Sequence, residues 1–448
     1  MTIIYGLIAL SLIIFIHEMG HFIAARFCGV KVEAFSIGMG PALLHKEYKG
    51  TDWRISLIPF GGYCAMKGQE DLQITKEGKD NRENADSDSF YGVATWKRII
   101  IAFCGPLFNV IFAVLSFTII SMIGFTNYTS NNKIILADEI YPEYSSNARL
   151  AGIKTGDKII KINNKEIKYF SDITNEVSVR PDEELIITVE RNGEILEYSV
   201  KTTMDKNTGA GKIGVINWID PIIKDVEKNS IAEKSGLQSG DIIIKIDDED
   251  ILNTASINKY INEKNKIELS YLRNEQIYKT VINIDNAEKS NLGLYFNLIK
   301  VKTEGENFFK AIKSGLKETF NTIGLTFKSL GLLFKGVDLT KAITGPLRIT
   351  VMLGDTAKAS FSENFTTGIV TMLGFLSLIS ISLFIMNLLP IPVLDGGIII
   401  FAIIEIFIKK PIPAKVQYYV QFIGIAFIII IFGFALFGDV SYIIKQWR

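Results

Sequence analysis

Two histidines and a glutamate lie close together near the start of the chain, in the pentapeptide His17-Glu18-Met19-Gly20-His21, which fits the pattern H-E-x-x-H. On a helix, residues i and i+4 share one face, so both imidazoles can bind one metal ion. Glu18 can then act as the general base toward a water molecule at that metal. The chain has only three histidines, and this motif contains two of them. The pattern therefore predicts a metal-dependent hydrolase; the alternative is a buried cluster of polar residues that binds no metal.

A zinc site of this kind needs a third protein ligand and leaves the fourth position to water. His45 is one candidate, but its neighbours Lys46 and Glu47 indicate an exposed residue. Asp395 is the better candidate, because it follows a long apolar run within the segment NLLPIPVLDGG at 387–397. The prolines of this segment interrupt a helix, and broken helices at membrane depth are tolerated beside a watery cavity. A hydrolase needs such a cavity to admit water.

The elements that must carry these residues are apolar helices. Four runs, at residues 3–28, 99–123, 365–389 and 420–437, are nearly free of charge. Each is long enough to cross a hydrocarbon core of about 30 Å as a helix. The first run lacks a basic start and a small-residue cleavage site, and it contains the H-E-x-x-H residues, so it is not a signal peptide. We therefore predict a polytopic α-helical membrane protein with four transmembrane helices.

Lysine and arginine are enriched at particular ends of these runs. Arg26 and Lys31 follow the first run, and Lys97 and Arg98 precede the second. Positively charged flanks face the cytoplasm. This predicts cytoplasmic segments at 27–98 and 405–419, with 126–364 and both termini outside.

The composition excludes several classes of protein. The 48 Lys and Arg residues balance the 48 Asp and Glu residues, which argues against a nucleic-acid-binding protein and against an acidic disordered tail. The three cysteines, Cys28, Cys64 and Cys104, are too few and too scattered for a disulfide framework or a CxxC metal site. Free thiols are expected.

The predicted outer segment contains an internal repeat. Residues 147–167 and 231–251 share a Gly-x-x-x-Gly-Asp turn that is followed by a β-branched run. A repeat of this kind implies two copies of one supersecondary unit. The recurring residues are Gly152, Gly156, Asp157, Lys161 and Ile162 in the first copy and Gly236, Gly240, Asp241, Lys245 and Ile246 in the second. Beyond the repeat, residues 308–335 show apolar residues at three- and four-residue steps, with lysines between them. They predict an amphipathic helix at the membrane surface, or a soluble helix packed against the repeat.

The repeat resembles the PDZ domain, whose sequences carry a similar Gly-Asp signature. The ordered set of H-E-x-x-H in a first membrane helix, two PDZ-like repeats, and N-x-x-P-x-P-x-L-D-G in a third helix is similar to the site-2 protease family. More narrowly it is similar to the bacterial RseP-like branch with two PDZ domains. Two further matches are Gly105-Pro106-Leu107-Phe108-Asn109 in the second run and the glycine-rich stretches near residues 38 and 61, which resemble a membrane-associated β-hairpin loop.

The resemblance implies roles for individual residues. It implies His17, His21 and Asp395 as zinc ligands, Glu18 as the catalytic base, and Asn387 as a residue that holds the substrate backbone. Gly61 and Gly62 would lie where a strand edge pairs with an unwound substrate. Ile398 is a departure, because the branch often carries histidine after L-D-G-G, and this leaves open a difference in the hydrogen bonding around the aspartate.

The resemblance also implies a function: an intramembrane zinc metalloprotease, located in a bacterial cytoplasmic membrane, for single-pass membrane proteins such as anti-sigma factors or signal-peptide remnants. Its partners would be these substrates, the lipid bilayer and peptide ligands of the PDZ-like repeats, without nucleic acid. The alternative is a non-catalytic membrane scaffold that captures extracytoplasmic peptides. The expected divisions are a first membrane helix (1–28), a β-loop region (29–97), a second membrane helix (98–125), two PDZ-like domains (126–213 and 214–302), an amphipathic region (303–364), a third membrane helix (365–400) and a fourth membrane region (401–448).

Overall fold

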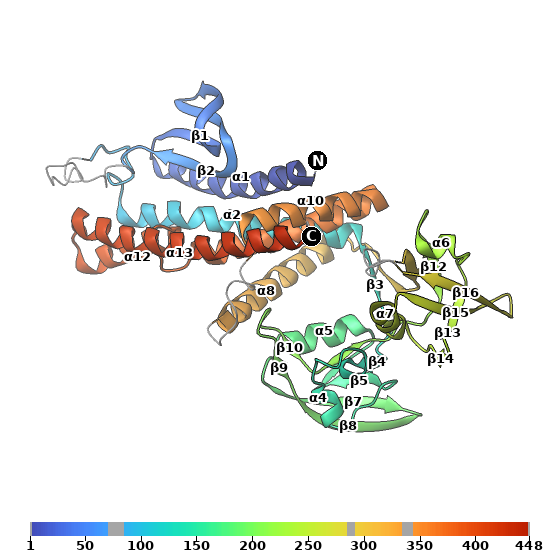
Figure 1. Ribbon diagram of the computed structural model, residues 1–448. Helices are drawn as coiled ribbons and strands as arrows, with labels where there is room; N and C mark the ends of the chain where they lie inside the picture. Colours follow the sequence, from blue (N-terminus) through green and yellow to red (C-terminus); the bar gives the residue numbers. More distant parts are fainter. Residues whose placement is uncertain (1, 70–84, 285–291, 334–343, 447–448) are drawn as a thin grey trace. The chain divides into compact units, whose positions relative to one another are not determined.

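The computed structural model in Figure 1 describes residues 2–69, 85–284, 292–333 and 344–446. The chain forms two compact units. Unit 1 is made of Met1–Phe125 and Thr303–Arg448, and unit 2 of Thr126–Lys302. The residues of the H-E-x-x-H motif and Asp395 therefore belong to the same unit, although they lie near opposite ends of the sequence.

Unit 1 combines long apolar helices with one β-hairpin. Within the described ranges, four helices are long and apolar enough to cross a membrane, and they coincide with the four predicted runs. A helix satisfies its own backbone hydrogen bonds, which lipid cannot do, so these runs form helices. The elements of unit 1 are α1 (Thr2–Cys28), β1 (Val32–Tyr48), β2 (Thr51–Met66), α2 (Thr95–Ile123), α8 (Phe308–Leu333), α10 (Pro346–Glu363), α11 (Phe365–Asn387), α12 (Asp395–Ile408) and α13 (Ala414–Gln446).

The third apolar run ends earlier than its hydropathy indicates. Helix α11 stops at Asn387, and a separate helix, α12, begins at Asp395 and runs across the boundary expected at residue 400. The prolines between them cannot continue a helix. The turn into α12 also requires glycine: a Cβ on Gly396 would lie 2.3 Å from the Leu389 carbonyl oxygen, and one on Gly397 would lie 2.4 Å from that of Ile391.

Helix α2 is the centre of unit 1 and packs against α1, α8, α11 and α12. Small residues allow the close approaches. A Cβ on Gly20 of α1 would lie 2.2 Å from the Cys104 carbonyl oxygen of α2, and one on Gly315 of α8 would lie 2.4 Å from the Thr118 hydroxyl oxygen. Such small-residue contacts are typical of helices that associate in membranes.

Helix α8 confirms the helix predicted within 308–335, of which residues 334 and 335 lie outside the described part. Its packing differs from what the apolar pattern indicates. The face on α2 includes small residues, with Ala311 and Thr319 fully buried, and the apolar Ile323 and Leu330 pack in a cluster with α2 and α11. By contrast, Phe309, Phe320 and Phe327 of the apolar row are 83%, 66% and 55% exposed. Phe309, Phe320 and Phe327 are thus free to contact lipid, while the small residues together with Ile323 and Leu330 hold the helix to the bundle.

Unit 2 contains two lobes with the same strand order, which reproduces the repeat in the sequence. The four-stranded sheets have the orders β6-β5-β7-β8 and β14-β13-β15-β16. The first lobe contains β4 (Ile134–Leu136), α3 (Ala137–Ile140), α4 (Asn147–Leu150), β5 (Lys158–Ile162), β6 (Lys165–Glu166), α5 (Phe170–Ser178), β7 (Glu184–Arg191), β8 (Glu194–Lys201), β9 (Thr203–Met204), β10 (Gly211–Lys212) and β11 (Val215–Asn217). The second contains β12 (Ile223–Val226), α6 (Ile231–Lys234), β13 (Ile242–Ile246), β14 (Glu249–Asp250), α7 (Thr254–Glu263), β15 (Lys266–Arg273), β16 (Gln276–Asn283) and β17 (Leu294–Phe296). Two further strands, β3 (Phe125–Thr129) and β18 (Ile299–Thr303), pair with each other. Because β11 pairs with β4, it belongs to the first lobe, beyond the boundary expected at residue 213.

The repeated aspartate has the same structural partner in both lobes. Asp157 is buried and binds the guanidinium of Arg191 at 2.7 Å through both oxygens. Asp241 is fully buried and binds Arg273 in the same way, at 2.6 and 2.7 Å. Each arginine ends the long strand that follows the repeat. The Gly-Asp turn is therefore held to the sheet by a bidentate ion pair, an arrangement that is geometrically specific.

Candidate metal centre

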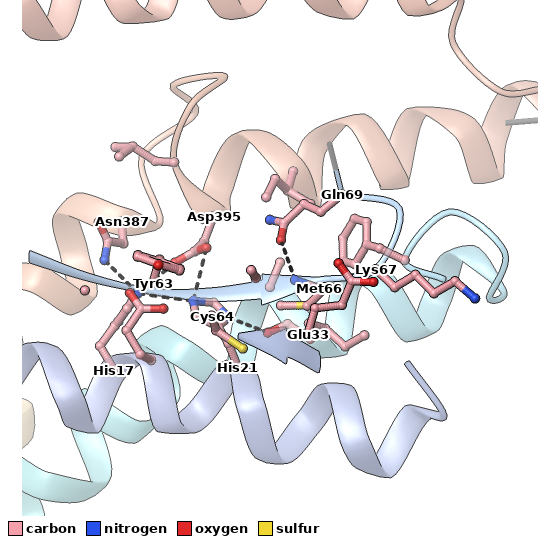
Figure 2. Close-up of a pocket in the computed structure, with 18 of the residues that line it drawn as sticks. His17, His21, Glu33, Tyr63, Cys64, Met66, Lys67, Gln69, Asn387 and Asp395 are labelled. Atoms are coloured by element: carbon pink, nitrogen blue, oxygen red, sulfur yellow. Dashed lines mark hydrogen bonds and ion pairs between the residues drawn. The ribbon is translucent and has the colours of Figure 1, made fainter. Parts of the chain in front are cut away.

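The two histidines of the H-E-x-x-H motif lie one helical turn apart on α1 and are both buried. Their side chains point to one place, with the two Nε2 atoms 3.2 Å apart. Asp395, the first residue of α12, reaches the same place: its Oδ2 lies 3.3 Å from His17 Nε2 and its Oδ1 lies 3.4 Å from His21 Nε2. Figure 2 shows the three side chains pointing toward one another from α1 and α12.

These spacings fit a zinc ion. When ligand atoms lie about 2.0–2.2 Å from zinc at tetrahedral angles, neighbouring ligand atoms lie about 3.3–3.6 Å apart. The two Nε2 atoms are 3.2 Å apart, and each lies 3.3 or 3.4 Å from one oxygen of the Asp395 carboxylate, which is close to this spacing. Two imidazoles and one carboxylate are also a donor set found in catalytic zinc sites. Among the residues that the structure describes, this is the one group of His, Cys, Asp and Glu side chains close enough to hold a metal.

The outer nitrogens of both imidazoles bind helix α2. His21 Nδ1 lies 2.9 Å from the main-chain carbonyl oxygen of Ile101. A carbonyl oxygen only accepts, so His21 carries its proton on Nδ1, and the neutral ring keeps a lone pair on Nε2 for a metal. His17 Nδ1 lies 3.1 Å from the side-chain amide of Asn109. Helix α2 thus fixes how both rings are oriented.

Gly105 makes room for His21 against α2. A Cβ at this position would lie 2.2 Å from His21 Nε2 and 2.4 Å from Cε1. The imidazole therefore lies directly over the glycine, and any side chain there must displace the ring. The Gly-Pro-x-x-Asn pattern of α2 has a physical basis here, since its glycine accommodates one histidine and its asparagine contacts the other.

We predict that Gly105→Ala weakens zinc binding and proteolysis without unfolding the bundle. The added methyl group displaces His21 Nε2, and a misplacement of about 1 Å in a catalytic constellation costs about 100-fold in rate. Gly374→Ala in α11 is the matched control, because a Cβ there would meet only Ile120 Cδ1, at 3.9 Å. The measurements are zinc affinity and cleavage rate of both variants. Equal values for Gly105→Ala and Gly374→Ala would show that His21 does not depend on this contact.

A cavity of about 1190 Å³ opens beside the three side chains. Glu18 lines it, as does Cys64 of β2. The volume is large enough for a peptide segment together with water. At the other end of the cavity, Lys67 binds Asp86 at 2.8 Å and Asp88 at 2.6 Å. These carboxylates raise the pKa of Lys67 above its usual range, so the amine stays charged.

The β-hairpin supplies one wall of the cavity. Residues 32–37 of β1 pair on one side with 52–55 of β2 and on the other with 62–66, so β2 folds back along β1. In the described part of the chain, residues 62–66 pair along one edge only, and they line the cavity. Gly61 and Gly62 lie at the start of this stretch. Gly62 packs tightly on α1, since a Cβ would lie 3.0 Å from Ile14 and 3.5 Å from Glu18 Cγ.

The other residues singled out in the sequence also have definite places. Asn387 ends α11, lines the cavity and directs its Nδ2 to within 3.2 Å of His17 Nε2 (Figure 2). Ile398 packs against an apolar cluster of α1, the hairpin and α2. His45 lies far from this site in the hairpin, mostly exposed, with Nδ1 3.3 Å from Asp52. The cysteines are free thiols, as predicted. Sequence reasoning identified the Gly-Pro-x-x-Asn pattern but gave Asn109 no role.

Comparisons with known proteins show a family likeness over nearly the whole chain. The sequence model of peptidase family M50 matches residues 5–431. The chain is 36% identical to a predicted zinc metalloprotease of Treponema pallidum, over 98% of this chain and 99% of that protein. It is 34% identical to a predicted zinc metalloprotease of Borreliella burgdorferi, over 98% of each chain. It is 29% identical to the regulator of sigma-E protease RseP of Escherichia coli, over 97% of each chain.

Proposed function

The chain belongs to peptidase family M50, and from this premise we propose that it is an intramembrane zinc metalloprotease that cuts single-pass membrane proteins within or near the bilayer. Its four apolar helices make it a multi-pass membrane protein. One observation carries the proposal: two imidazole nitrogens and a carboxylate converge at 3.2–3.4 Å beside a cavity. Ionisable groups are costly at membrane depth, and they are kept there when they have a function.

In this proposal His17, His21 and Asp395 hold the zinc ion. When bound there, zinc polarises the scissile carbonyl and makes a water molecule acidic enough to lose a proton near neutral pH. Glu18 takes that proton as the water oxygen attacks the carbonyl carbon. Glu18 then passes the proton to the amide nitrogen as the C–N bond breaks, which leaves one carboxyl end and one amine end.

The substrate must present an extended backbone to this site, because a helix shields its own peptide bonds. The edge of β2 at residues 62–66 supports capture by strand addition, in which main-chain hydrogen bonds provide affinity. Gly61 and Gly62 let this stretch lie close to Met39 and Ile14, and in this proposal they begin the edge that receives the substrate. Asn387, whose amide lies at the inner end of the cavity, is placed to bind a substrate carbonyl next to the cut bond.

We infer a regulatory role for the two lobes of unit 2. Their matching strand order and repeated Gly-Asp turns support two PDZ-like modules. In this proposal the modules lie outside the bacterial cytoplasmic membrane and bind extracytoplasmic peptide ends, while the metal centre lies near the cytoplasmic side. Substrates already trimmed on the outer side, such as anti-sigma-factor-like proteins or signal-peptide remnants, would then be favoured.

A cleavage assay with zinc removal tests the function. The purified full-length protein in detergent should contain about one zinc per chain and cut truncated single-pass substrates. A chelator should abolish cleavage, and added zinc should restore it. A well-folded protein that captures extracytoplasmic peptides, holds no zinc and cuts none of the substrates would overturn the protease proposal in favour of a scaffold.

A further inference from the structure

The environment of His17 Nδ1 differs from that of His21 Nδ1. His21 meets a main-chain carbonyl oxygen, which accepts only, whereas His17 meets the side-chain amide of Asn109, whose two ends have opposite hydrogen-bonding character. Asn109 is fully buried. Its Nδ2 lies 3.1 Å from His17 Nδ1, and its Oδ1 is a buried acceptor without a partner among the described residues. Buried polar atoms of this kind call for an explanation.

The amide end that faces His17 selects the tautomer of the imidazole. If Nδ2 faces the ring, Nδ1 must accept, and the neutral ring carries its proton on Nε2, where it blocks a metal. If Oδ1 faces the ring, Nδ1 keeps the proton and Nε2 has a free lone pair. Ligating histidines almost always donate the other ring N–H to an acceptor, which sets ring orientation and strengthens the ligand. A half-turn of the amide group exchanges the two states without moving the helix.

We propose that Asn109 is the positioning residue for the zinc ligand His17, with its Oδ1 accepting the Nδ1 proton so that Nε2 is held ready for the metal. This inference rests on the proposed zinc site. The helix spacing supports it: His17 and His21 are four residues apart on α1, and Asn109 and Gly105 are four residues apart on α2. The two pairs face each other, His21 over Gly105 and His17 beside Asn109.

The main chain of Asn109 has a separate contact, which supplies a control. Ser380 of α11 donates its hydroxyl proton to the Asn109 carbonyl oxygen at 3.1 Å, and Ser380 is fully buried. Ser380→Ala therefore removes a buried hydrogen bond at the same residue of α2 without touching His17. A loss of zinc affinity that reflected local packing alone would occur in this variant too.

The test compares zinc affinity of the full-length protein by competition with a chelator. Asn109→Leu keeps the size of the side chain and removes both polar ends; we expect about a 10- to 100-fold loss of affinity. Asn109→Asp keeps an acceptor and cannot donate, and we expect affinity within about threefold of wild type or tighter, because carboxylate acceptors serve in such triads. Ser380→Ala should also stay within about threefold, since it leaves the acceptor for His17 in place.

A second measurement reads the tautomer of His17 directly, first with Asn109 unchanged and then in the Asn109→Leu variant. Because the chain has three histidines, the ¹⁵N spectrum of histidine-labelled, zinc-loaded protein is simple, and His45→Gln removes the signals of the histidine outside the site. We expect both remaining rings to carry their proton on Nδ1. The Asn109→Leu variant should lose the hydrogen-bond shift of the His17 Nδ1 proton while keeping that of His21.

The outcomes separate this proposal from the proposed function. Wild-type affinity in Asn109→Leu, an equal loss in folded Asn109→Leu and Asn109→Asp, or a proton on Nε2 of His17 in the loaded protein would each overturn the role of Asn109 alone. A wild-type protein that binds no zinc, or an Asp395→Ala variant that binds it normally, would overturn the zinc site and this inference with it.

Discussion

Replacing Glu18 by glutamine should reduce peptide-bond cleavage by about 100- to 10,000-fold, the range that a positioned general base contributes. The amide has nearly the size of the carboxylate, but it cannot take a proton from water. None of the three converging ligand atoms belongs to Glu18, so zinc content should remain near one per chain. The measurement is the cleavage rate of a truncated single-pass substrate, together with metal analysis of the same sample.

Glu33→Gln is the matched control for this prediction. Glu33 is an exposed carboxylate on β1 that lines the same cavity outside the H-E-x-x-H motif. Its change removes the same charge from the cavity and should leave the rate within about threefold of wild type, because it serves no proton transfer. If Glu18→Gln cut as fast as Glu33→Gln, the proposed mechanism would be wrong.

Replacing Asp395 by alanine should remove zinc from the protein. The change deletes one of three protein ligands and leaves two imidazoles, which bind the metal weakly. Loss of a residue that merely supports a ligand costs about 10- to 100-fold in affinity, so loss of the ligand itself should cost more than about 100-fold. Proteolysis should fall with the metal. Equilibrium dialysis against zinc measures the first effect, and the cleavage assay measures the second.

Asp355→Ala provides the comparison for Asp395→Ala. Asp355 is an exposed carboxylate on α10 in the same unit, so its removal should affect neither zinc content nor rate. Addition of excess zinc should not restore Asp395→Ala to wild-type activity at concentrations that saturate the wild type. Stoichiometric zinc in folded Asp395→Ala would show that the third ligand is a different residue.

Much of the architecture follows from short-range patterns in the sequence. Four apolar runs of sufficient length predict four helices, and the structure contains them. The Gly-Asp repeat predicts two equivalent units, and the two lobes share one strand order. The prolines before Asp395 predict a helix break at that place, and α11 and α12 are separated there. In each case the prediction depends on the types of neighbouring residues along the chain, and these are fixed by the local sequence.

Short-range patterns did not predict which side chains pack together when they lie far apart in the sequence. The apolar pattern of α8 indicates one packing face, but only part of it packs on protein: Ile323 and Leu330 join a core cluster with α2 and α11. The small residues Ala311, Gly315 and Thr319 are buried as well, whereas three phenylalanines of the pattern are exposed. In a bilayer, lipid solvates apolar side chains as well as protein does, so contact area between helices depends on small residues and close approach instead. Hydropathy therefore shows that the helix is amphipathic and does not show which side packs on protein. The local sequence does not indicate the arginine partners of Asp157 and Asp241 either, because each arginine lies on a later strand of the chain.

The sequence by itself determined the chemistry that the protein can carry: two imidazoles one helical turn apart, a glutamate beside them, and an aspartate at the end of a proline-broken helix. Tertiary structure alone decided that the two imidazoles and the aspartate converge within 3.4 Å, and that the Ile101 carbonyl and the Asn109 side chain hold the far nitrogens of the two rings. Residue types and spacing are local properties, whereas this convergence depends on how closely α1, α2 and α12 approach. Gly20 and Gly105 permit this close approach because they carry no Cβ. The sequence has 36 glycines, and only the packed helices show that these two have this role.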